Sequence, residues 1–348
     1  MTANGQPILV IGLFNKPADA EHRYLTATEQ MAQLFEKNSI AVITTSASQG
    51  KLLRLIDTVY TIIKNRAQFS MAIAPLFGTR PSFIWQEIAT RLLKLFHKKI
   101  ILVVHGGSIP ERMQKNAAPF LKALRRADVV VCPSPYMQHV LAQYHITTVL
   151  IENVLPLNEY LFYPRQHLSP RIIWMRSFED TYNPLMAVRM AALLAKKYPD
   201  FAMVMAGRDD GMLSQTKALA AQLGVIEKIS FPGFIQLSQK QEYARTYDIY
   251  ICTNRIDNAP VSIIEFMAMG VPVVAVKTGG IPYLITDNVN GCLVMPDDEK
   301  AMAEKIDMLI NNPELCKHIC ANAHTYSRNY DEALVLQKWS TVLQLNRP

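Results

Sequence analysis

The sequence of 348 residues contains no apolar run near the ~20 residues that a membrane-spanning helix requires. It also has no cationic stretch ahead of its first apolar segment, residues 8–13, and that segment is too short for a signal peptide. The absence of both features predicts a protein that stays in the cytoplasm.

Cysteine is scarce, with five residues scattered in apolar surroundings. This odd number favours reduced thiols packed as small hydrophobic side chains over a disulfide framework. Cys316 and Cys320 share a helix face, but no set of His or Cys partners completes a zinc site around them. The sequence therefore predicts no bound metal.

Acidic residues are few in the first half of the chain. Residues 1–165 hold 18 Lys and Arg against 10 Asp and Glu, whereas the rest of the chain holds 18 against 19. A basic half suits nucleic acid, an anionic membrane or a phosphorylated acceptor, or it is simply a solvated surface. Aromatic and basic residues do not interleave as in a single-strand-binding module, so we expect no nucleic acid. With an anionic membrane as the partner, we expect the protein at the inner face of the plasma membrane.

Short apolar runs alternate with helical patterns along the whole chain, which predicts an α/β fold of parallel sheets. The length suits two domains. The expected strands of the first half are residues 8–13, 40–44, 71–74, 100–104, 129–132 and 148–151. Those of the second half are residues 172–175, 202–206, 229–231, 249–252, 273–276 and 292–294. The expected helices between the strands include residues 20–38, 83–96 and 136–144 of the first half and residues 184–197, 214–223, 261–269, 299–310 and 313–327 of the second half. We expect two Rossmann-like, doubly wound domains that face a central ligand-binding cleft.

Three prolines interrupt residues 155–170, which marks this stretch as the linker. We therefore assign residues 1–165 to an N-terminal domain and residues 166–330 to a C-terminal domain. Residues 331–348 contain an amphipathic helix around Trp339 that needs a packing partner. This helix either crosses back to the first domain or packs on its own domain.

Two carboxylates, Asp257 and Glu265, flank a predicted turn and helix start. Pro260 falls near the first helical turn, where a missing N–H costs nothing, so the amides of Val261 and Ser262 are free donors. A helix start of this kind binds a diphosphate without a metal. Glu265, one turn later, either accepts both hydroxyls of a ribose or caps a neighbouring amide.

Gly279 and Gly280 follow an apolar run, where a strand ends in a turn. With these glycines, residues 250–298 resemble the donor-binding core of retaining GT-B glycosyltransferases of family 4, the glycosyl transferases group 1. The same resemblance continues in weaker form through residues 174–176, 198–207 and 229–234, and it is thin in the first half of the chain.

The resemblance implies that Glu265 binds the ribose of a UDP- or GDP-sugar and that Asp257 faces the transferred sugar. Arg176 matches the arginine that grips the donor diphosphate, and the loop that includes Asn258, Val261 and Ser262 supplies amides. The resemblance also implies that residues 166–330 hold this nucleotide sugar and that residues 1–165 hold the acceptor. The nucleotide sugar is a co-substrate, and no resident cofactor is implied. In the first domain, His105 matches a histidine that faces the sugar, although a histidine beside a glycine pair is equally a structural hydrogen-bonding group.

The sequence departs from this family pattern at three places. Thr181 stands where a lysine is usual, Asp257 replaces a glutamate with a shorter reach, and residues 14–23 lack the glycine pair of the acceptor-side loop. Arg208 is a candidate for the missing second phosphate cation. The adjacent pairs Asp209–Asp210 and Asp297–Asp298 are interpreted as turn and helix caps and not as a metal site.

The resemblance, together with these features, implies a metal-independent, retaining glycosyltransferase that moves a sugar to a glycan, lipid-linked or other acceptor. The alternatives are a nucleotide-sugar-binding partner subunit with impaired catalysis, and a nucleotide-sugar 2-epimerase for which we find no acid and base residues. We expect Glu265→Ala to abolish donor binding while the fold is retained.

Overall fold

The computed structural model describes residues 5–14, 25–48 and 50–344, which fall into two units. The first unit comprises Met1–Leu155 and Tyr330–Pro348, and the second comprises Pro156–Asn329. The chain thus enters the second unit ten residues before the boundary that the linker prolines suggested. The last helix belongs to the first unit.

The first unit contains six parallel strands in the order β2-β1-β3-β4-β5-β6. Its strands are β1 (Ile8–Val10), β2 (Val42–Thr44), β3 (Met71–Leu76), β4 (Lys99–Val104), β5 (Val129–Cys132) and β6 (Val149–Leu150). Its helices are α1 (Ala27–Lys37), α2 (Lys51–Asn65), α3 (Arg80–Leu95), α4 (Ile109–Asn116), α5 (Ala118–Leu124), α6 (Pro135–Ala142) and α14 (Glu332–Leu343).

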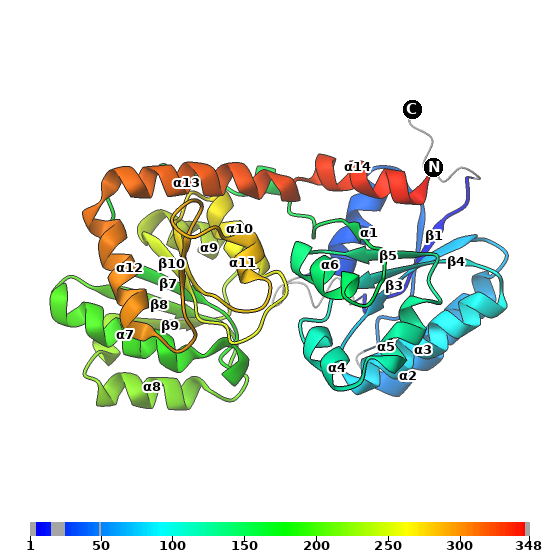
Figure 1. Ribbon diagram of the computed structural model, residues 1–348, viewed down its shortest axis with the longest axis horizontal. Coiled ribbons are helices and arrows are strands. Elements are labelled where there is room, and N and C mark those ends of the chain that lie inside the picture. Colours follow the sequence, from blue (N-terminus) through cyan, green and yellow to red (C-terminus); the bar gives the residue numbers. More distant parts are fainter. Residues whose placement is uncertain (1–4, 15–24, 49, 345–348) are drawn as a thin grey trace. The chain divides into compact units, whose positions relative to one another are not determined.

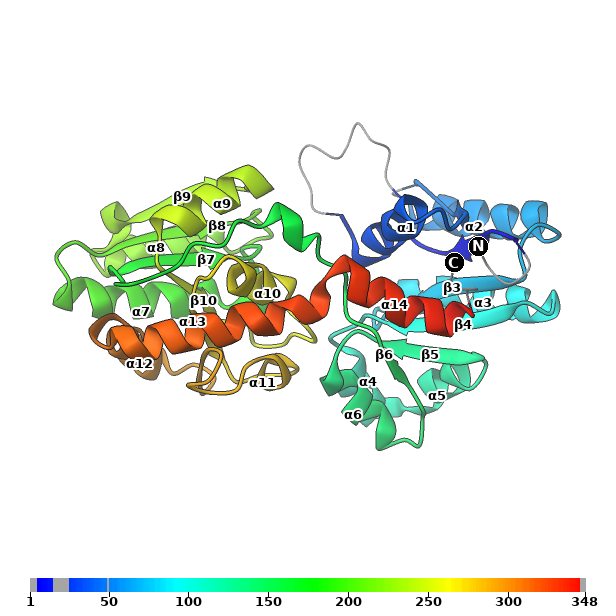
Figure 2. The same cartoon turned by 90° about the horizontal axis from the view of Figure 1, so that it is seen from above.

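Helices cover both faces of this sheet because its strands are apolar on both sides (Figure 1, Figure 2). Ile8 and Val10 face one layer, in which α1 meets α14 through an edge-to-face contact of Phe35 with Trp339. Successive strand residues point to opposite faces, so Leu9 packs with α2 and α3 on the other side.

The second unit also contains six parallel strands, in the order β12-β11-β10-β7-β8-β9. Its strands are β7 (Arg171–Met175), β8 (Ala202–Ala206), β9 (Ile229–Gly233), β10 (Ile249–Cys252), β11 (Val273–Val276) and β12 (Cys292–Val294). Its α-helices are α7 (Pro184–Lys197), α8 (Leu213–Gln222), α9 (Leu237–Thr246), α10 (Val261–Ala268), α11 (Ile281–Leu284), α12 (Glu299–Asn311) and α13 (Pro313–Ser327). The second unit also contains three short 3-10 turns, η2 (Leu157–Glu159), η3 (Asp180–Tyr182) and η4 (Ile226–Lys228). A fourth, η5 (Arg328–Tyr330), spans the boundary at which the chain returns to the first unit.

Two helix layers sandwich this second sheet as well (Figure 1). Helices α7, α12 and α13 bury one face, which includes Trp174. On the other face α10 packs against β10, where the rings of Phe266 and Tyr250 stack with centroids 4.2 Å apart. The two sheets confirm the predicted α/β class with two doubly wound domains.

The strand order of the second unit reverses direction between β7 and β10. β7 continues to β8 on one side, whereas β10 is followed by β11 on the other. The loops after β7 and β10 therefore diverge at the carboxyl edge of the sheet, the position at which open α/β sheets bind ligands. Among the described helices, none is both long and apolar enough to cross a membrane.

Candidate functional site

The expected donor residues of the second unit gather at this switch point. Arg176 directly follows β7, Asp257 lies in the loop after β10, and Gly279 lies in the turn after β11. β10 pairs with both β7 and β11, so these three segments leave neighbouring strands at one edge. Topology thus brings together residues that are up to about a hundred positions apart.

Asp257 and Arg176 form a half-buried ion pair. Arg176 Nη2 lies 3.1 Å from Asp257 Oδ2, and their side chains are 17% and 18% exposed. The same Oδ2 accepts a hydrogen bond of 2.8 Å from Asn254 Nδ2. Among the described residues, Asp257 Oδ1 has no partner, so this carboxylate is held through one oxygen and presents the other.

The Arg176 guanidinium stays charged in this setting. Burial by itself lowers the pKa of Arg176, but the nearby Asp257 carboxylate outweighs that effect and raises it. The guanidinium also lies over the ring of Tyr182, 5.2 Å from its centroid. Within the described part of the chain, the buried Nε of Arg176 has no hydrogen-bond partner. A charged group with an unused N–H donor suits an anion such as a diphosphate.

The N-terminus of α10 presents unused amide donors beside this pair. Pro260 is the N-cap residue and has no side-chain cap, and its carbonyl accepts from the amide of Ile263. No acceptor for the amides of Val261 and Ser262 exists among the described residues. Ser262 is buried, and its hydroxyl pairs with that of Tyr250 at 2.8 Å. Asn258, earlier in the loop, is also buried.

Glu265 is buried, with 7% exposure, and is bound by two side chains that the sequence did not reveal. Lys240 Nζ on α9 lies 2.6 Å from Glu265 Oε1, and the Tyr160 hydroxyl donates to the same oxygen at 2.8 Å. Among the described residues, Glu265 Oε2 has no partner. Like Asp257, this carboxylate is held through one oxygen while the other is unused.

The turn of Gly279 and Gly280 packs directly on the Asp257 loop. The Gly280 amide donates to the Asp257 carbonyl at 2.9 Å. Gly279 has φ +50, and a Cβ there would lie 2.1 Å from that carbonyl oxygen. The glycine pair therefore positions the carboxylate loop, and the Gly280 amide is already engaged in the fold.

We expect Gly279→Ala to displace the Asp257 loop and to reduce donor affinity at least tenfold. The added methyl cannot occupy the space of a backbone oxygen. The matched control is Gly224→Ala, because Gly224 also has positive φ, +70, but a Cβ there meets nothing within 4 Å. Titration calorimetry with UDP and GDP measures the difference, and equal affinity in the two variants would contradict it.

His105, expected to face the sugar, lies in the first unit directly after β4. Its amide donates to the Leu76 carbonyl at 3.1 Å, and its ring stacks on Phe77 with centroids 6.2 Å apart. Burial lowers the pKa of His105 to about 4. The ring is therefore neutral near pH 7, able to accept or donate one hydrogen bond but not to act as a cation.

The lowered pKa of His105 predicts acid-dependent stability. Since the folded state favours the neutral ring, this contribution is present above pH 6.5, the ordinary pKa value, and is lost as the pH falls through about 4. We expect His105→Asn to flatten the decline of unfolding free energy between these pH values. The control is His145→Asn, an exposed position of the same unit. Urea unfolding at pH 7 and pH 4.5 tests this, and parallel declines in wild type and His105→Asn would refute it.

The departures from the family pattern are also visible in the structure. Thr181 lies in η3, where its carbonyl accepts a hydrogen bond from the Arg255 amide. Arg208 is exposed, and its carbonyl accepts from the Phe178 amide. Most of the stretch that lacks the glycine pair, residues 15–23, lies outside the described residues.

One aspartate of each acidic pair acts as a turn or helix cap, as interpreted from the sequence. Asp209 accepts from the amides of Gly211 and Leu213, and Asp298 caps α12 by accepting from the Ala301 amide. Asp297 instead accepts from the side-chain amide of Asn183. Across the described residues, no group of three His, Cys, Asp or Glu side chains could hold a metal ion.

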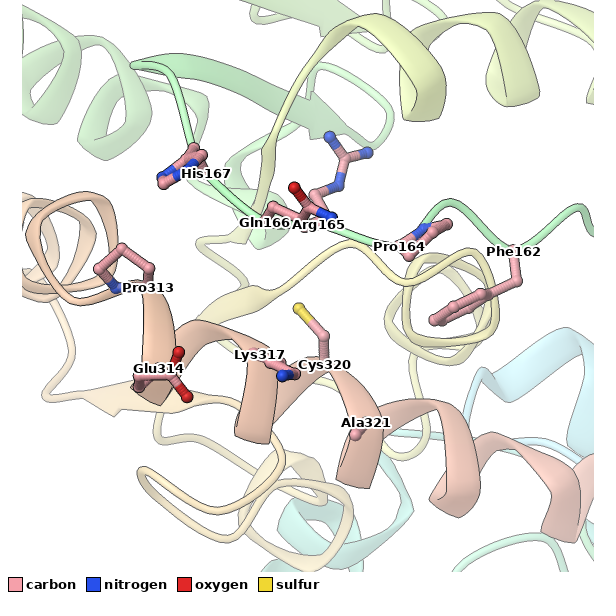
Figure 3. Close-up of a pocket in the computed structure, with 10 residues that line it drawn as sticks. All are labelled: Phe162, Pro164, Arg165, Gln166, His167, Pro313, Glu314, Lys317, Cys320 and Ala321. Carbon is pink, nitrogen blue, oxygen red and sulfur yellow. The ribbon is translucent and has the colours of Figure 1, made fainter.

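A cavity of 470 Å³ elsewhere in the second unit does not contain the expected donor residues (Figure 3). It lies between the segment around Arg165 and helix α13, with Glu314, Lys317 and Cys320 on the helix side. Arg165 is bound by the Asp248 carboxylate and the Ala244 carbonyl, so its charge is already neutralised. This cavity lacks the paired carboxylates and helix amides of the switch point.

Residues 164–326 match the family model described as glycosyl transferases group 1. The matched region covers most of the second unit and just under half of the chain. An uncharacterized glycosyltransferase of Haemophilus influenzae is 28% identical over 152 residues, 43% of this chain and 42% of the relative. The amylovoran biosynthesis glycosyltransferase AmsK of Erwinia amylovora is 24% identical over 61% of this chain and 55% of its own length. The alignments thus span about half the length of these relatives.

Solved structures resemble the chain over both units. HepE of Anabaena, in complex with UDP and glucose, gives a TM-score of 0.74 at 19% identity, covering 97% of this chain and 99% of HepE. Sucrose-phosphate synthase of Thermosynechococcus elongatus gives 0.80 at 16% identity, covering 98% and 99%. At these identities the likeness shows the fold, and the chain has the GT-B fold.

Proposed function

We propose that this protein is a metal-independent, retaining glycosyltransferase that uses a UDP- or GDP-sugar. The observation that carries the proposal is that two carboxylates, Asp257 and Glu265, have the same pattern of hydrogen bonds. Each is held through one oxygen and has the other unused, beside the open donors of Arg176 and α10. The group 1 family match of residues 164–326 supports the same reading.

In the proposed reaction, the bond between the sugar C1 and the diphosphate oxygen breaks and a bond from C1 to an acceptor oxygen forms. The acceptor hydroxyl releases its proton to solvent, and the electron pair of the broken bond leaves with the nucleoside diphosphate, which gains one negative charge. Arg176 and the amides of Val261 and Ser262 would stabilise that charge, which is the main electrostatic requirement of the transfer. Glu265 would accept ribose hydroxyls through Oε2, and Asp257 would face the sugar. His105 would contact the sugar as a neutral hydrogen-bonding group.

The acceptor is proposed to be a glycan, lipid-linked or other acceptor held by the first unit. The AmsK relative is named for amylovoran biosynthesis, which favours a role in cell-envelope polysaccharide synthesis. The basic excess of residues 1–165 favours a cytoplasmic protein in peripheral contact with an anionic membrane.

A panel of UDP- and GDP-sugars, scored for release of free nucleoside diphosphate, tests the activity. We expect turnover of one donor that persists in EDTA. With an acceptor in hand, the anomeric configuration of the product, measured by NMR, tests retention. Loss of turnover in EDTA would contradict metal independence, and an inverted product would contradict retention.

The second candidate is a nucleotide-sugar-binding partner subunit with impaired catalysis. It is favoured by Thr181 at the position of the usual lysine, by the shorter Asp257, and by the engagement of Glu265 with Lys240. This candidate predicts calorimetric binding of a nucleotide sugar without turnover of any donor in the panel. A 2-epimerase would instead convert the sugar without an acceptor, which product analysis detects.

A further inference from the structure

Helix α2 carries an apolar stripe on its solvent side. Its exposed apolar residues are Leu52 (69%), Leu53 (63%), Ile56 (56%), Tyr60 (59%) and Ile63 (42%). At 3.6 residues per turn these positions fall within an arc of about 100°. The opposite side of the helix buries Thr58 and Ile62. The stripe is therefore not part of the hydrophobic core.

Helix α3 repeats this pattern next to α2. Its exposed Ile84, Ile88 and Leu95 have the i, i+4, i+11 spacing of Leu52, Ile56 and Ile63. The two helices are neighbours in one layer, because Trp85 Nε1 of α3 donates to Thr58 Oγ1 of α2 at 3.0 Å (Figure 1, Figure 2). Their inner sides both pack on the first sheet, so both stripes are on the outward side. We call the eight exposed apolar residues of α2 and α3 the α2–α3 face.

The positive charge of the chain is concentrated around this face. Residues 51–98 hold eight Lys and Arg against two Asp and Glu, an excess of six, while the whole chain has an excess of seven. One of the two acids, Glu87, is bound by Arg126 and Arg91. Lys51, Lys64 and Lys94 are exposed and form no ion pair with any described residue. Exposed cations therefore accompany the apolar stripes.

We propose that the α2–α3 face docks on an anionic lipid bilayer. Apolar side chains bordered by Lys and Arg match the requirements of the membrane interface, where acyl chains take the former and lipid phosphates take the latter. A second copy of the chain fits less well, because a symmetric contact would bring the same cations against each other. The inference specifies the surface for the proposed membrane contact and is independent of the donor chemistry.

The first test measures flotation of the full-length protein with vesicles. We expect stronger binding to phosphatidylcholine vesicles that contain phosphatidylglycerol than to pure phosphatidylcholine, with the difference reduced by salt. Leu52→Ser/Ile56→Ser is expected to weaken binding to the anionic vesicles at least tenfold. The matched control is Leu223→Ser/Met295→Ser, which removes two exposed apolar side chains of the second unit and is expected to bind like wild type.

A second pair of variants tests the charge. Lys51→Gln/Lys64→Gln is expected to weaken binding to the anionic vesicles by about fivefold per lysine, with little effect on neutral vesicles. Lys196→Gln/Lys300→Gln removes two exposed lysines of the second unit as the control. Equal losses in both lysine pairs would show that net charge, and not this face, governs binding, which would overturn the proposal.

Two further results would also overturn the docking proposal. One is equal binding of wild type to anionic and neutral vesicles. The other is a dimer in light scattering that Leu52→Ser/Ile56→Ser converts to a monomer, which would assign the face to a second copy. Nucleoside diphosphate release without vesicles is measured in parallel. Turnover with no vesicle binding would refute the docking face alone, whereas vesicle binding with no turnover would refute the transferase activity alone.

Discussion

Glu265→Ala is expected to lower the free energy of unfolding by about 3–5 kcal/mol, because it leaves a buried ammonium without its counter-ion. Lys240 is 1% exposed, and its Nζ is bound to Glu265 Oε1 at 2.6 Å. The sequence predicted that this substitution removes donor binding while the fold is retained. The structure adds a stability cost that sequence reasoning did not include.

Lys240→Met is expected to destabilise the protein by a similar amount, since it leaves the Glu265 carboxylate buried with the Tyr160 hydroxyl as its one hydrogen-bond partner among the described residues. Replacing both partners together, as Lys240→Met/Glu265→Leu, is expected to restore most of that loss. Arg245→Met is the control on the same helix: its pair with Glu242 is exposed, so we expect a change below about 1 kcal/mol. Urea unfolding followed by circular dichroism measures all four variants.

The same variants separate stability from ligand binding. If Glu265 binds ribose, calorimetric titration with UDP and GDP loses its signal in Glu265→Ala but retains it in Lys240→Met, which is equally destabilised yet keeps the carboxylate. An equal loss of affinity in both variants would mean that Glu265 acts through the fold. Unchanged affinity in Glu265→Ala would remove Glu265 from the donor site.

The parallel strands were predictable because their side chains are apolar on both faces. The sequence located β8 and β10–β12 at their observed ends and α7 and α13 as well. Both helices begin at a proline that follows a capping asparagine, Asn183 or Asn312. Local chemistry was sufficient at these positions, since strand burial and helix caps depend on neighbours in the sequence.

Helices α2 and α9 were not assigned from the sequence, for opposite reasons. α2 has apolar residues on both its inner and its outer side, together with several β-branched residues, so its pattern resembles neither a surface helix nor a strand. α9 is largely polar and buries only Lys240 and Ala244. The signal available in the sequence was the spacing of Lys240 and Ala244. Four positions apart, they lie on the same side of a polar helix, the side that faces inward.

The site residues were named through family resemblance, but their contacts were not predictable. Glu265 meets Lys240 from 25 positions away and Tyr160 from 105 positions away. The pairing of Arg176 with Asp257 spans 81 positions. Contacts of this kind depend on how the strands are ordered in the sheet, which a single sequence leaves open.

Arg176→Ala is expected to reduce the turnover of the preferred donor by about 10²–10³-fold, the usual effect of removing one preorganised donor from a developing negative charge. Asp257 would keep its hydrogen bond from Asn254, so its loop is expected to stay in place. Arg176→Lys is expected to recover only part of the rate, because a point charge cannot contact Asp257 and a phosphate with the geometry of a planar fork.

The control for this variant is Arg255→Ala, which removes a half-exposed arginine of the Asp257 loop that is bound to Asp180. Kinetics with saturating donor and titrations with UDP and GDP distinguish two roles for Arg176. Loss of kcat with unchanged nucleotide affinity would show that the guanidinium acts only on the transition state, whereas a parallel loss of both would show uniform diphosphate binding. Turnover within threefold of wild type would exclude Arg176 from either role. Of the Arg176–Asp257 ion pair, Asp257 alone would then remain a candidate for a part in the reaction.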